Sequence, residues 1–329
     1  MPGWDLEHIQ TIAMIGAGTM GAGIGLCFAR AGCRVMLCSQ TAAGLERAGR
    51  HVQRSLGLLV SEGSITPTDA ASIEHHLHLT LDWQQAVAGA QFVIESAPEQ
   101  LALKQDLFRR IASRCAPDAI LATNTSGLSI TAIAAACSRP QQVIGMHWAN
   151  PAELAPLVEI IPGEKTAEEV TRATVQLAER AGKMAVVIHK EIPGFASNRL
   201  QFAVLREALH LVAEGVVSAA DVDRVLKGGV GFRYPWLGPL ETADLGGLDV
   251  FHAIASYLFK ELSQASAPPD FFSQMIQEGK LGIKTGAGFY DYAEGDRQRL
   301  LDARDRFFIR QMQTLESIRN EEAGSNCKS

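Results

Sequence analysis

The 329-residue sequence lacks an excess of positive charge, and its net charge is −6 at pH 7. Proteins that bind nucleic acid or an anionic membrane usually carry a basic surface, so we expect neither partner. The first residues, MPGWDLEH, contain no basic stretch, and no secretory signal peptide is expected. Residues 9–29 and 119–138 lack charge, but glycines break the first stretch and a polar NTSG breaks the second. Neither is expected to cross a membrane.

The six cysteines form no pattern typical of a disulfide framework or a zinc site. No two make a CxxC pair, and most lie in apolar segments, at positions 27, 33, 38, 115, 137 and 327. This usage favours reduced thiols in a cytoplasmic protein. His75, His76 and His78 lie close together, but they have no clear i,i+4 pair and no nearby set of carboxylates. A solvated helix end is the favoured interpretation, and we predict no metal site.

A glycine-rich motif, GAGTMG at residues 16–21, follows a β-prone run and precedes an apolar helical pattern and a second strand. In this order, Gly16 allows a tight turn and Gly18 lets a pyrophosphate approach the backbone. Gly21 lets the helix pack against the strand. We therefore expect a dinucleotide to bind here. The alternative is a glycine-rich loop that serves packing alone.

An acidic residue that would bind the ribose hydroxyls is missing at the end of the second strand. Ser39 stands there, followed by Gln40 and Thr41. A hydroxyl still hydrogen-bonds a ribose, although without the assistance of a charge. Because no arginine follows at once to receive a 2′-phosphate, NAD is favoured over NADP.

Strands and helices then alternate through the first part of the chain. Strands are predicted at residues 91–94, 119–123, 142–148, 157–161 and 185–188, and helices at 42–62, 101–115 and 165–181. Another helix is expected to start within residues 64–71, with Thr68 as a possible cap. This alternation predicts an α/β domain, with a Rossmann-like, doubly wound and mostly parallel sheet, over residues 1–192.

Polar side chains follow several of these strands, at Glu95, Glu99, Asn124, Ser126 and His147. Ligands of open α/β sheets collect at the carboxyl ends of the strands, so we expect these residues and the glycine turn to share one rim. For residues 124–126 alone, the alternative is a helix start capped by the serine at position 126 or 129.

His147 and Glu159 stand in two apolar runs, separated by the loop that contains Asn150. Adjacent runs can bring these two side chains together. A buried carboxylate needs a partner, and an imidazole held by a carboxylate can act as a base near neutral pH. The alternative is a buried pair that only satisfies its own hydrogen bonds.

After residue 193 the strand patterns end and helices take over. They are predicted at residues 194–214, 219–227 with Ser218 as cap, 240–262 with a break at Gly246 and Gly247, 270–278 and 297–320. The apolar stripe of the last helix is expected to pack on its own domain or on a symmetry mate. Arg233 and Lys284 are candidate anion-binding residues, or else surface charges.

Together these motifs resemble the 3-hydroxyacyl-CoA dehydrogenase family over nearly the whole chain. The motifs are GAGTMG, E-x3-E-x4-K at 95–104, NTSGLSI at 124–130, GMHWANP at 145–151, LVEII at 157–161, PGFASNR at 193–199 and GIKTGAGFY at 282–290. The resemblance implies an NAD-dependent oxidation of a 3-hydroxy substrate to its 3-oxo product. It also implies an all-α dimerisation domain over residues 193–329, and hence a homodimer.

The resemblance assigns a role to each candidate residue. His147 and Glu159 fall on the catalytic pair, Ser126 and Asn150 on contacts to the substrate oxygen, and Asn198 on a second-domain residue near the active site. With Arg233 and Lys284, Asn198 completes the expected substrate contacts. The expected cofactor contacts are Gly16, Gly18, Thr19, Met20, Gly21, Ser39, Glu99, Lys104 and Asn124.

The sequence departs from the CoA-using members at Ala155 and Pro156, where NPAELAPLVE replaces the usual NPxxxMKLVE. This is similar to branches that oxidise free hydroxy acids or hydroxymethyl compounds, such as gulonate 3-dehydrogenases with lens λ-crystallin, carnitine dehydrogenases and pyridine-carboxylate dehydrogenases. A small free substrate is therefore favoured. A true 3-hydroxyacyl-CoA dehydrogenase and a crystallin-like, NAD(H)-binding structural protein are the alternatives.

Overall fold

The structure is a computed structural model that describes Trp4 and residues 9–326. The described residues form two compact units. One contains the chain up to Ala196 together with Asp305–Gln313, and the other contains Ser197–Arg304 and the residues from Thr314 onward. The predicted boundary at 192/193 precedes this division by a few residues. The prediction did not foresee that a segment near the C-terminus packs with the first unit.

The first unit is built on an eight-stranded sheet in the order β3-β2-β1-β4-β5-β6-β7-β8. The strands are β1 Thr11–Ile15, β2 Arg34–Cys38, β3 Leu77–Thr80, β4 Phe92–Glu95, β5 Ile120–Thr123, β6 Val143–Trp148, β7 Leu157–Pro162 and β8 Met184–Val187. All neighbouring pairs run parallel except β6 and β7. The predicted Rossmann-like, mostly parallel sheet is confirmed.

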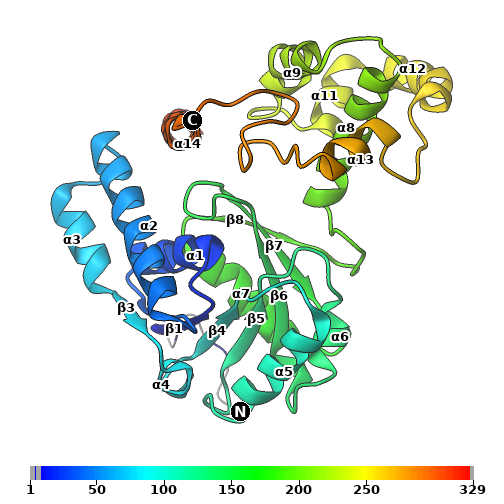
Figure 1. Cartoon of the computed structure of the whole chain (residues 1–329). Coiled ribbons are helices and arrows are strands. Elements are labelled where there is room, and N and C mark those ends of the chain that lie inside the picture. The colour runs from blue at the N-terminus through cyan, green and yellow to red at the C-terminus, as the bar shows by residue number, and fades with distance from the viewer. Residues whose placement is uncertain (1–3, 5–8, 327–329) are drawn as a thin grey trace. The chain divides into compact units, whose positions relative to one another are not determined.

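Helices cover both faces of this sheet (Figure 1). They are α1 Thr19–Arg30, α2 Ala42–Ser61, α3 Pro67–His75, α4 Trp83–Ala88, α5 Leu101–Ala112, α6 Ile130–Ala134 and α7 Glu168–Arg180, with a 3₁₀ turn at Pro140–Gln142. Alternate strand residues enter two apolar cores, since successive side chains of a strand point to opposite faces. One core lies against α1, α2, α3 and α7, and the other against α4, α5 and α6.

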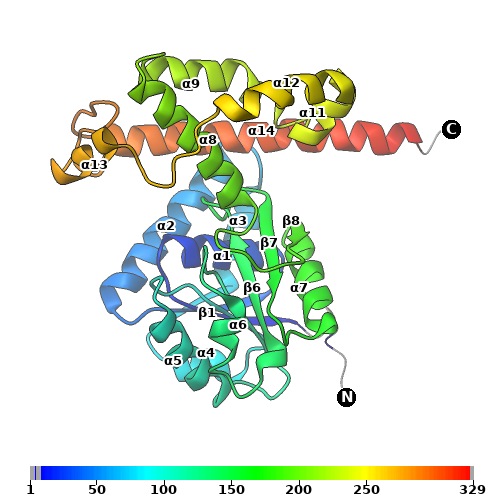
Figure 2. The same cartoon turned by 90° about the vertical axis from the view of Figure 1, so that its right-hand side faces the viewer.

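The second unit is helical, as predicted, with no strand among its described residues. Its helices are α8 Ser197–Ala213, α9 Ala219–Gly228, α10 Val230–Arg233, α11 Pro239–Gly246, α12 Leu248–Glu261 and α13 Asp270–Gln277. The last helix, α14 Asp296–Asn326, is one long continuous helix (Figure 2), and its middle segment belongs to the first unit.

Some local predictions are wrong for identifiable reasons. The strand β3 and the short helix α4 were not predicted, because four to six residues leave little periodicity to detect. Helix α3 is capped by Thr66, not Thr68, through a capping box with Asp69. The predicted helix from residue 194 starts at Ser197 instead, because Gly194 and Phe195 adopt positive φ angles of 77° and 49°.

Other local predictions are confirmed. Ser129 accepts from Ala132 N and caps α6, whereas Ser126 does not cap it. Ser218 caps α9, and the glycine pair separates α11 from α12. Five of the six cysteines are buried and unpaired, and Cys327 lies outside the described residues. Burial raises the pKa of the Cys38 thiol to about 11, which keeps it in the protonated form.

In the part of the chain that the structure describes, no helix is long and apolar enough to cross a membrane. Its histidine, cysteine, aspartate and glutamate side chains also form no group of three placed to hold a metal ion.

Candidate active site

The turn after β1 is shaped to receive a dinucleotide. Gly16 has a φ of 113°, and a Cβ atom there would lie 2.5 Å from the carbonyl oxygen of Ser96, which follows β4. A Cβ at Gly21 would overlap the Gly16 carbonyl, so the start of α1 packs directly on this turn. At Gly18 no atom lies within 4 Å of such a Cβ, which leaves open space beside the N-terminus of α1. These features fit a pyrophosphate.

This turn lies where the order of the strands reverses. Strand β1 pairs with β2 on one side and with β4 on the other, and ligands of doubly wound sheets bind at such a point. Ser39 follows β2, and its hydroxyl accepts from Thr41 N at 3.3 Å. The Ser39 hydroxyl therefore lies at the end of β2, where the ribose is expected, and its contact with the ribose stays a prediction.

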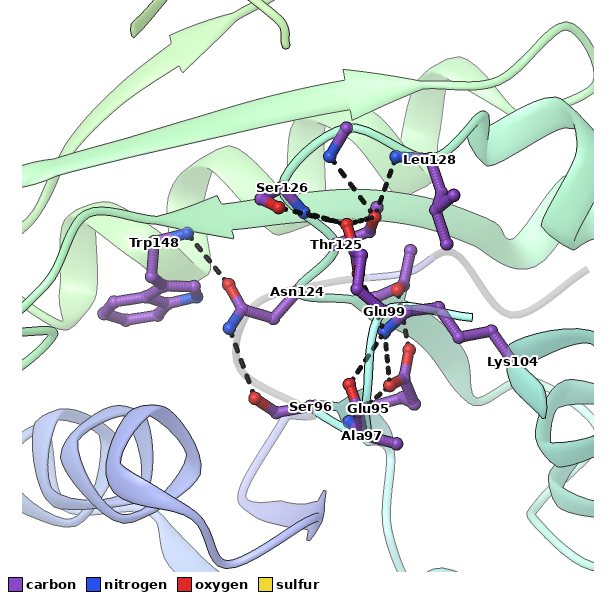
Figure 3. A network of polar contacts seen from close by, with 12 residues as sticks. Glu95, Ser96, Ala97, Glu99, Lys104, Asn124, Thr125, Ser126, Leu128 and Trp148 are labelled. Atoms are coloured by element: carbon purple, nitrogen blue, oxygen red, sulfur yellow. Dashed lines mark hydrogen bonds and ion pairs between the residues drawn. The ribbon is translucent and has the colours of Figure 1, made fainter. Parts of the chain in front are cut away.

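Next to this turn, a buried ion pair ties the end of β4 to α5 (Figure 3). Lys104 and Glu95 are fully buried, and the Lys104 ammonium lies 2.7 Å from Glu95 Oε1. Thr123 donates its hydroxyl to Glu95 Oε2 at 2.7 Å, and Ala97 N donates to Oε1 at 2.5 Å. Both carboxylate oxygens are thus satisfied, as a buried charge requires.

Glu99 connects this pair to the turn after β5. Lys104 Nζ lies 3.5 Å from Glu99 Oε2, while Glu99 Oε1 accepts from Thr125 Oγ1 at 2.6 Å, Ser126 N at 2.8 Å and Ser126 Oγ at 3.1 Å. Burial acts to raise the pKa of Glu99, but these hydrogen bonds and the Lys104 charge outweigh it and hold the pKa below its usual value. Lys104 is fully buried, so its contact with the cofactor stays a prediction, as does that of Glu99.

Asn124 joins the ends of three strands (Figure 3). Its Nδ2 donates to Ser96 Oγ at 3.3 Å, and its Oδ1 accepts from Trp148 N at 3.0 Å. The structure therefore brings the ends of β4, β5 and β6 onto one rim with the Gly16 turn, as the sequence predicted. The contacts of Asn124 with the cofactor stay a prediction.

Strands β6 and β7 lie side by side (Figure 2). They pair antiparallel, with His147 and Glu159 as register partners. His147 Nδ1 lies 2.8 Å from Glu159 Oε2. The Glu159 side chain is only 2% exposed, and that of His147 is 12% exposed. Because the carboxylate binds Nδ1, Nε2 is the ring nitrogen left for proton transfer.

The turn that ends the first unit supports this pair. Ala196 N donates to Glu159 Oε1 at 2.9 Å, so that the second carboxylate oxygen points at the imidazole. Phe195 is fully buried, and its ring centroid lies 5.6 Å from that of His147. Neither contact was predictable from the sequence, since a phenylalanine with positive φ is rare and has no sequence signature.

Asn150 is exposed in the loop between β6 and β7, and the residues after it are anchored. Glu153 is buried and lies within 2.9 Å of His51 Nε2, while its Oε1 accepts from Ser55 Oγ at 3.0 Å. Burial acts to raise the pKa of Glu153, but the contacts from His51 and Ser55 hold it below its usual value. Lys183 Nζ donates to the carbonyl oxygens of residues 152 and 155 at 2.7 and 2.9 Å. Sequence reasoning missed these supports.

The remaining predicted substrate contacts lie in the helical unit. Asn198 is in the first turn of α8, Arg233 ends α10 and Lys284 lies in the loop after α13. Arg233 and Lys284 are exposed and Asn198 is partly buried. Their contact with a substrate stays a prediction.

Comparison with known proteins identifies the family. The family model described as 3-hydroxyacyl-CoA dehydrogenase, NAD binding domain, matches residues 11–192. The model of the C-terminal domain of the same family matches residues 194–292. The two models together cover most of the chain in the order that the motifs predicted.

Relatives of two kinds match the chain. A 5-formyl-3-hydroxy-2-methylpyridine 4-carboxylate 5-dehydrogenase of Mesorhizobium japonicum is 34% identical over 308 residues, covering 94% of this chain and 99% of the relative. A probable 3-hydroxybutyryl-CoA dehydrogenase of Deinococcus radiodurans is 38% identical over 280 residues, covering 85% of this chain and 99% of the relative.

Solved structures show the same division. The structure of a 5-formyl-3-hydroxy-2-methylpyridine 4-carboxylic acid 5-dehydrogenase, described as an NAD⁺-dependent dismutase, matches with a TM-score of 0.88 at 34% identity, over 94% of this chain and 99% of the other. That of the (S)-3-hydroxybutyryl-CoA dehydrogenase from Ralstonia eutropha matches with 0.72 at 33% identity, over 87% and 100%.

The open turn beside α1 and the rim that carries His147 and Glu159 agree with these matches. The chain belongs to the 3-hydroxyacyl-CoA dehydrogenase family and is an NAD-dependent oxidoreductase.

Proposed function

We propose that this protein uses NAD⁺ to oxidise the hydroxyl group of a small, free hydroxy acid or hydroxymethyl compound to a carbonyl, with His147 as the base. The contact of His147 Nδ1 with Glu159 Oε2 at 2.8 Å carries the proposal. A carboxylate in this place orients the imidazole and stabilises its protonated form. The rim formed by the Gly16 turn, Asn124 and Trp148 supports it, since it puts this base beside the expected cofactor site.

In the proposed mechanism His147 Nε2 removes the proton of the substrate hydroxyl while the hydrogen on the same carbon leaves as hydride. The bound nicotinamide supplies the hydride acceptor. Ser126 and Asn150 hold the substrate oxygen as it becomes a carbonyl oxygen. The Ser126 hydroxyl donates to Glu99 in the present structure, so it must turn away from Glu99 to donate to the substrate oxygen. In the reverse direction His147 returns the proton as an acid.

The preference for a small substrate rests on two observations. The chain has Ala155 and Pro156 where CoA-using members usually have methionine and lysine. Pro156 accepts from Met184 N at 2.8 Å and so joins the loop to β8. The match to the pyridine-carboxylate enzyme also covers 94% of this chain. The match to the Deinococcus relative, which is named as a probable 3-hydroxybutyryl-CoA dehydrogenase, covers 85%.

Homodimer formation and a cytoplasmic location are part of the proposal. Large apolar side chains are exposed on the helical unit, including Phe232 at 79%, Leu240 at 80% and Leu245 at 75%. An apolar surface of this kind usually marks a protein interface. The buried, unpaired cysteines suit a reducing compartment. Light scattering of the purified protein tests the dimer, and a monomer at micromolar concentration would contradict it.

The decisive experiment measures NADH formation with a panel of small hydroxy acids and hydroxymethyl pyridine carboxylates, and NADH oxidation with acetoacetyl-CoA. We expect turnover of a small substrate and little with the thioester. Rapid turnover of acetoacetyl-CoA would instead support the 3-hydroxyacyl-CoA dehydrogenase alternative. The variant His147→Gln should lose roughly a hundredfold or more in turnover. It should still bind NADH, which separates a lost base from a lost fold.

A crystallin-like structural role is the alternative of another class. A structural protein needs no His–Glu pair beside its cofactor turn, so the 2.8 Å contact argues against that role. Absence of turnover with every substrate of the panel, together with tight NADH binding, would favour it.

A further inference from the structure

The C-terminal helix α14 begins after residue 292, where the match to the family's C-terminal domain ends. Its segment Asp305–Gln313 nevertheless packs with the sheet unit. The segment is therefore an addition to the part of the chain that the family models describe. The contacts of this segment with α2 and with the loop that carries Asn150 indicate its role.

Polar contacts fix this segment along α2. Asp305 is 2% exposed, and its Oδ2 accepts from Arg54 Nη2 of α2 at 2.6 Å. At the end of α2, Glu62 accepts from Arg306 at 2.9 Å and from Arg310 at 2.8 Å. Gln313 donates to the Glu62 carbonyl oxygen at 2.9 Å. These contacts spread over two turns of α14, so they fix its direction along α2 as well as its position.

An apolar contact reaches further, to the loop that carries Asn150. Ile309 is 3% exposed and forms a buried cluster with Leu59 of α2 and Leu154 of the loop. Leu154 directly follows Glu153, whose carboxylate is held by His51 and Ser55, also on α2. The loop therefore contacts α2 at two places, through Glu153 and through Leu154. Helix α14 covers the Leu154 contact with Ile309.

We propose that Ile309 and Asp305 are positioning residues for the active site: they hold α2 and Leu154 so that Asn150 meets the substrate oxygen. This inference rests on the role of Asn150 in the proposed function. Asn150 is exposed, and it stands four residues before Leu154. Because Glu153 and the carbonyl oxygens of residues 152 and 155 stay anchored, only part of a movement of Leu154 toward a space left at position 309 reaches Asn150. A displacement of about 1 Å at a reacting group lowers a rate by roughly a hundredfold, so a smaller shift is expected to cost about tenfold.

The test compares Ile309→Ala with Phe307→Ala. Phe307 lies on the same helix, but its side chain is 63% exposed and outside the buried cluster. We expect Ile309→Ala to lower kcat about tenfold, with an unchanged Kd for NADH, and Phe307→Ala to keep the kcat of the parent protein. Assays are run well below the melting temperature of each variant. Ile309→Val, which removes one methyl group, replaces Ile309→Ala if the latter does not fold, and it should show a smaller loss of kcat.

A second readout separates positioning from stability alone. The primary deuterium isotope effect on kcat, measured with substrate labelled at the carbinol carbon, should rise in Ile309→Ala, because a misplaced substrate slows hydride transfer. Asp305→Asn should change kcat and the isotope effect in the same direction. A lower melting temperature with unchanged kcat and isotope effect would overturn the proposal and leave α14 a structural helix.

The failure of this inference differs from a failure of the proposed function. If His147→Gln keeps normal turnover, the catalytic assignment is wrong, whatever the Ile309 variants do. If His147→Gln loses turnover while Ile309→Ala keeps it, the catalytic assignment stands and the positioning role of α14 is refuted.

Discussion

Phe195 offers the sharpest test of how the His147–Glu159 pair is held, because its backbone and its ring make separate contributions. Its φ of 49° lies in the left-handed region, which costs a non-glycine residue about 1–2 kcal/mol. Its ring is fully buried, and replacing such a phenylalanine by alanine costs about 3–5 kcal/mol. Alanine loses the ring but keeps the backbone cost, whereas glycine loses both.

We therefore expect Phe195→Gly to be at least as stable as Phe195→Ala. The relief of about 1–2 kcal/mol exceeds the roughly 0.4–1 kcal/mol that the freedom of glycine in the unfolded chain costs. The difference should favour glycine by up to about 1.6 kcal/mol. Urea unfolding followed by tryptophan fluorescence measures it, provided that the first unit unfolds in a single transition.

The matched control is Phe108, which is 1% exposed and lies inside helix α5. At a helical position glycine is about 1 kcal/mol worse than alanine, so Phe108→Gly should be less stable than Phe108→Ala. The sign of the glycine–alanine difference should thus reverse between the two sites. Equal signs at both sites would refute the argument that the Phe195 backbone carries the cost.

The same variants also report on the active site. Both replacements remove the ring that packs on His147, so turnover should fall in each. Phe195→Gly keeps a residue suited to the left-handed conformation and so keeps Ala196 N directed at Glu159 Oε1. It should retain more turnover than Phe195→Ala.

Three further predictions concern the charged groups. Glu159→Gln should lower turnover while NADH binding survives, because the imidazolium loses its stabilising carboxylate; unchanged turnover would return Glu159 to a packing role. Lys104→Met should cost about 3–5 kcal/mol in urea unfolding, because Glu95 is left as an uncompensated buried charge, and a loss below about 1 kcal/mol would contradict this. The pKa of Glu153 is lowered in the folded state, so the stability that Glu153 contributes is present above its usual pKa near 4.5 and is lost as pH falls below that value. In Glu153→Gln the free energy of unfolding should therefore depend less on pH in this range. An unaltered midpoint of acid unfolding would count against this.

The elements that the sequence predicts well are those with a clear period or a clear motif. The Gly16 turn, the alternating strands and helices of the sheet and the Ser218 cap follow from local patterns that need no distant partner. The rim was predictable as well, because parallel strands bring their carboxyl ends to one edge. These features explain why Asn124 and His147 were expected near the glycine turn.

The supports of the site were not predictable in this way. That Lys104 is enclosed depends on where Glu95 and Thr123 meet after the sheet has formed. Phe195 adopts a left-handed backbone conformation that phenylalanine disfavours. The preferred conformations of the residue therefore favour the predicted helix from residue 194, which the structure does not form. The docking of Ile309 on Leu154 joins residues more than a hundred positions apart, and a helical stripe does not name its partner.

The one antiparallel pair in the sheet has a chemical consequence. In an antiparallel hairpin, two directly opposed residues have their side chains on the same face, within reach of each other. His147 and Glu159 are such a pair, and only a short loop is needed to connect their strands. A parallel β7 would need a crossover of about a dozen residues, and the loop with Asn150 could not then return directly to the base. The neighbours of the pair in each strand enter the apolar core on the opposite face, namely Met146, Trp148, Val158 and Ile160. A one-residue slip of β7 would therefore replace Glu159 by an aliphatic side chain and turn the carboxylate into that core, so the packing of the sheet itself fixes the carboxylate against the imidazole.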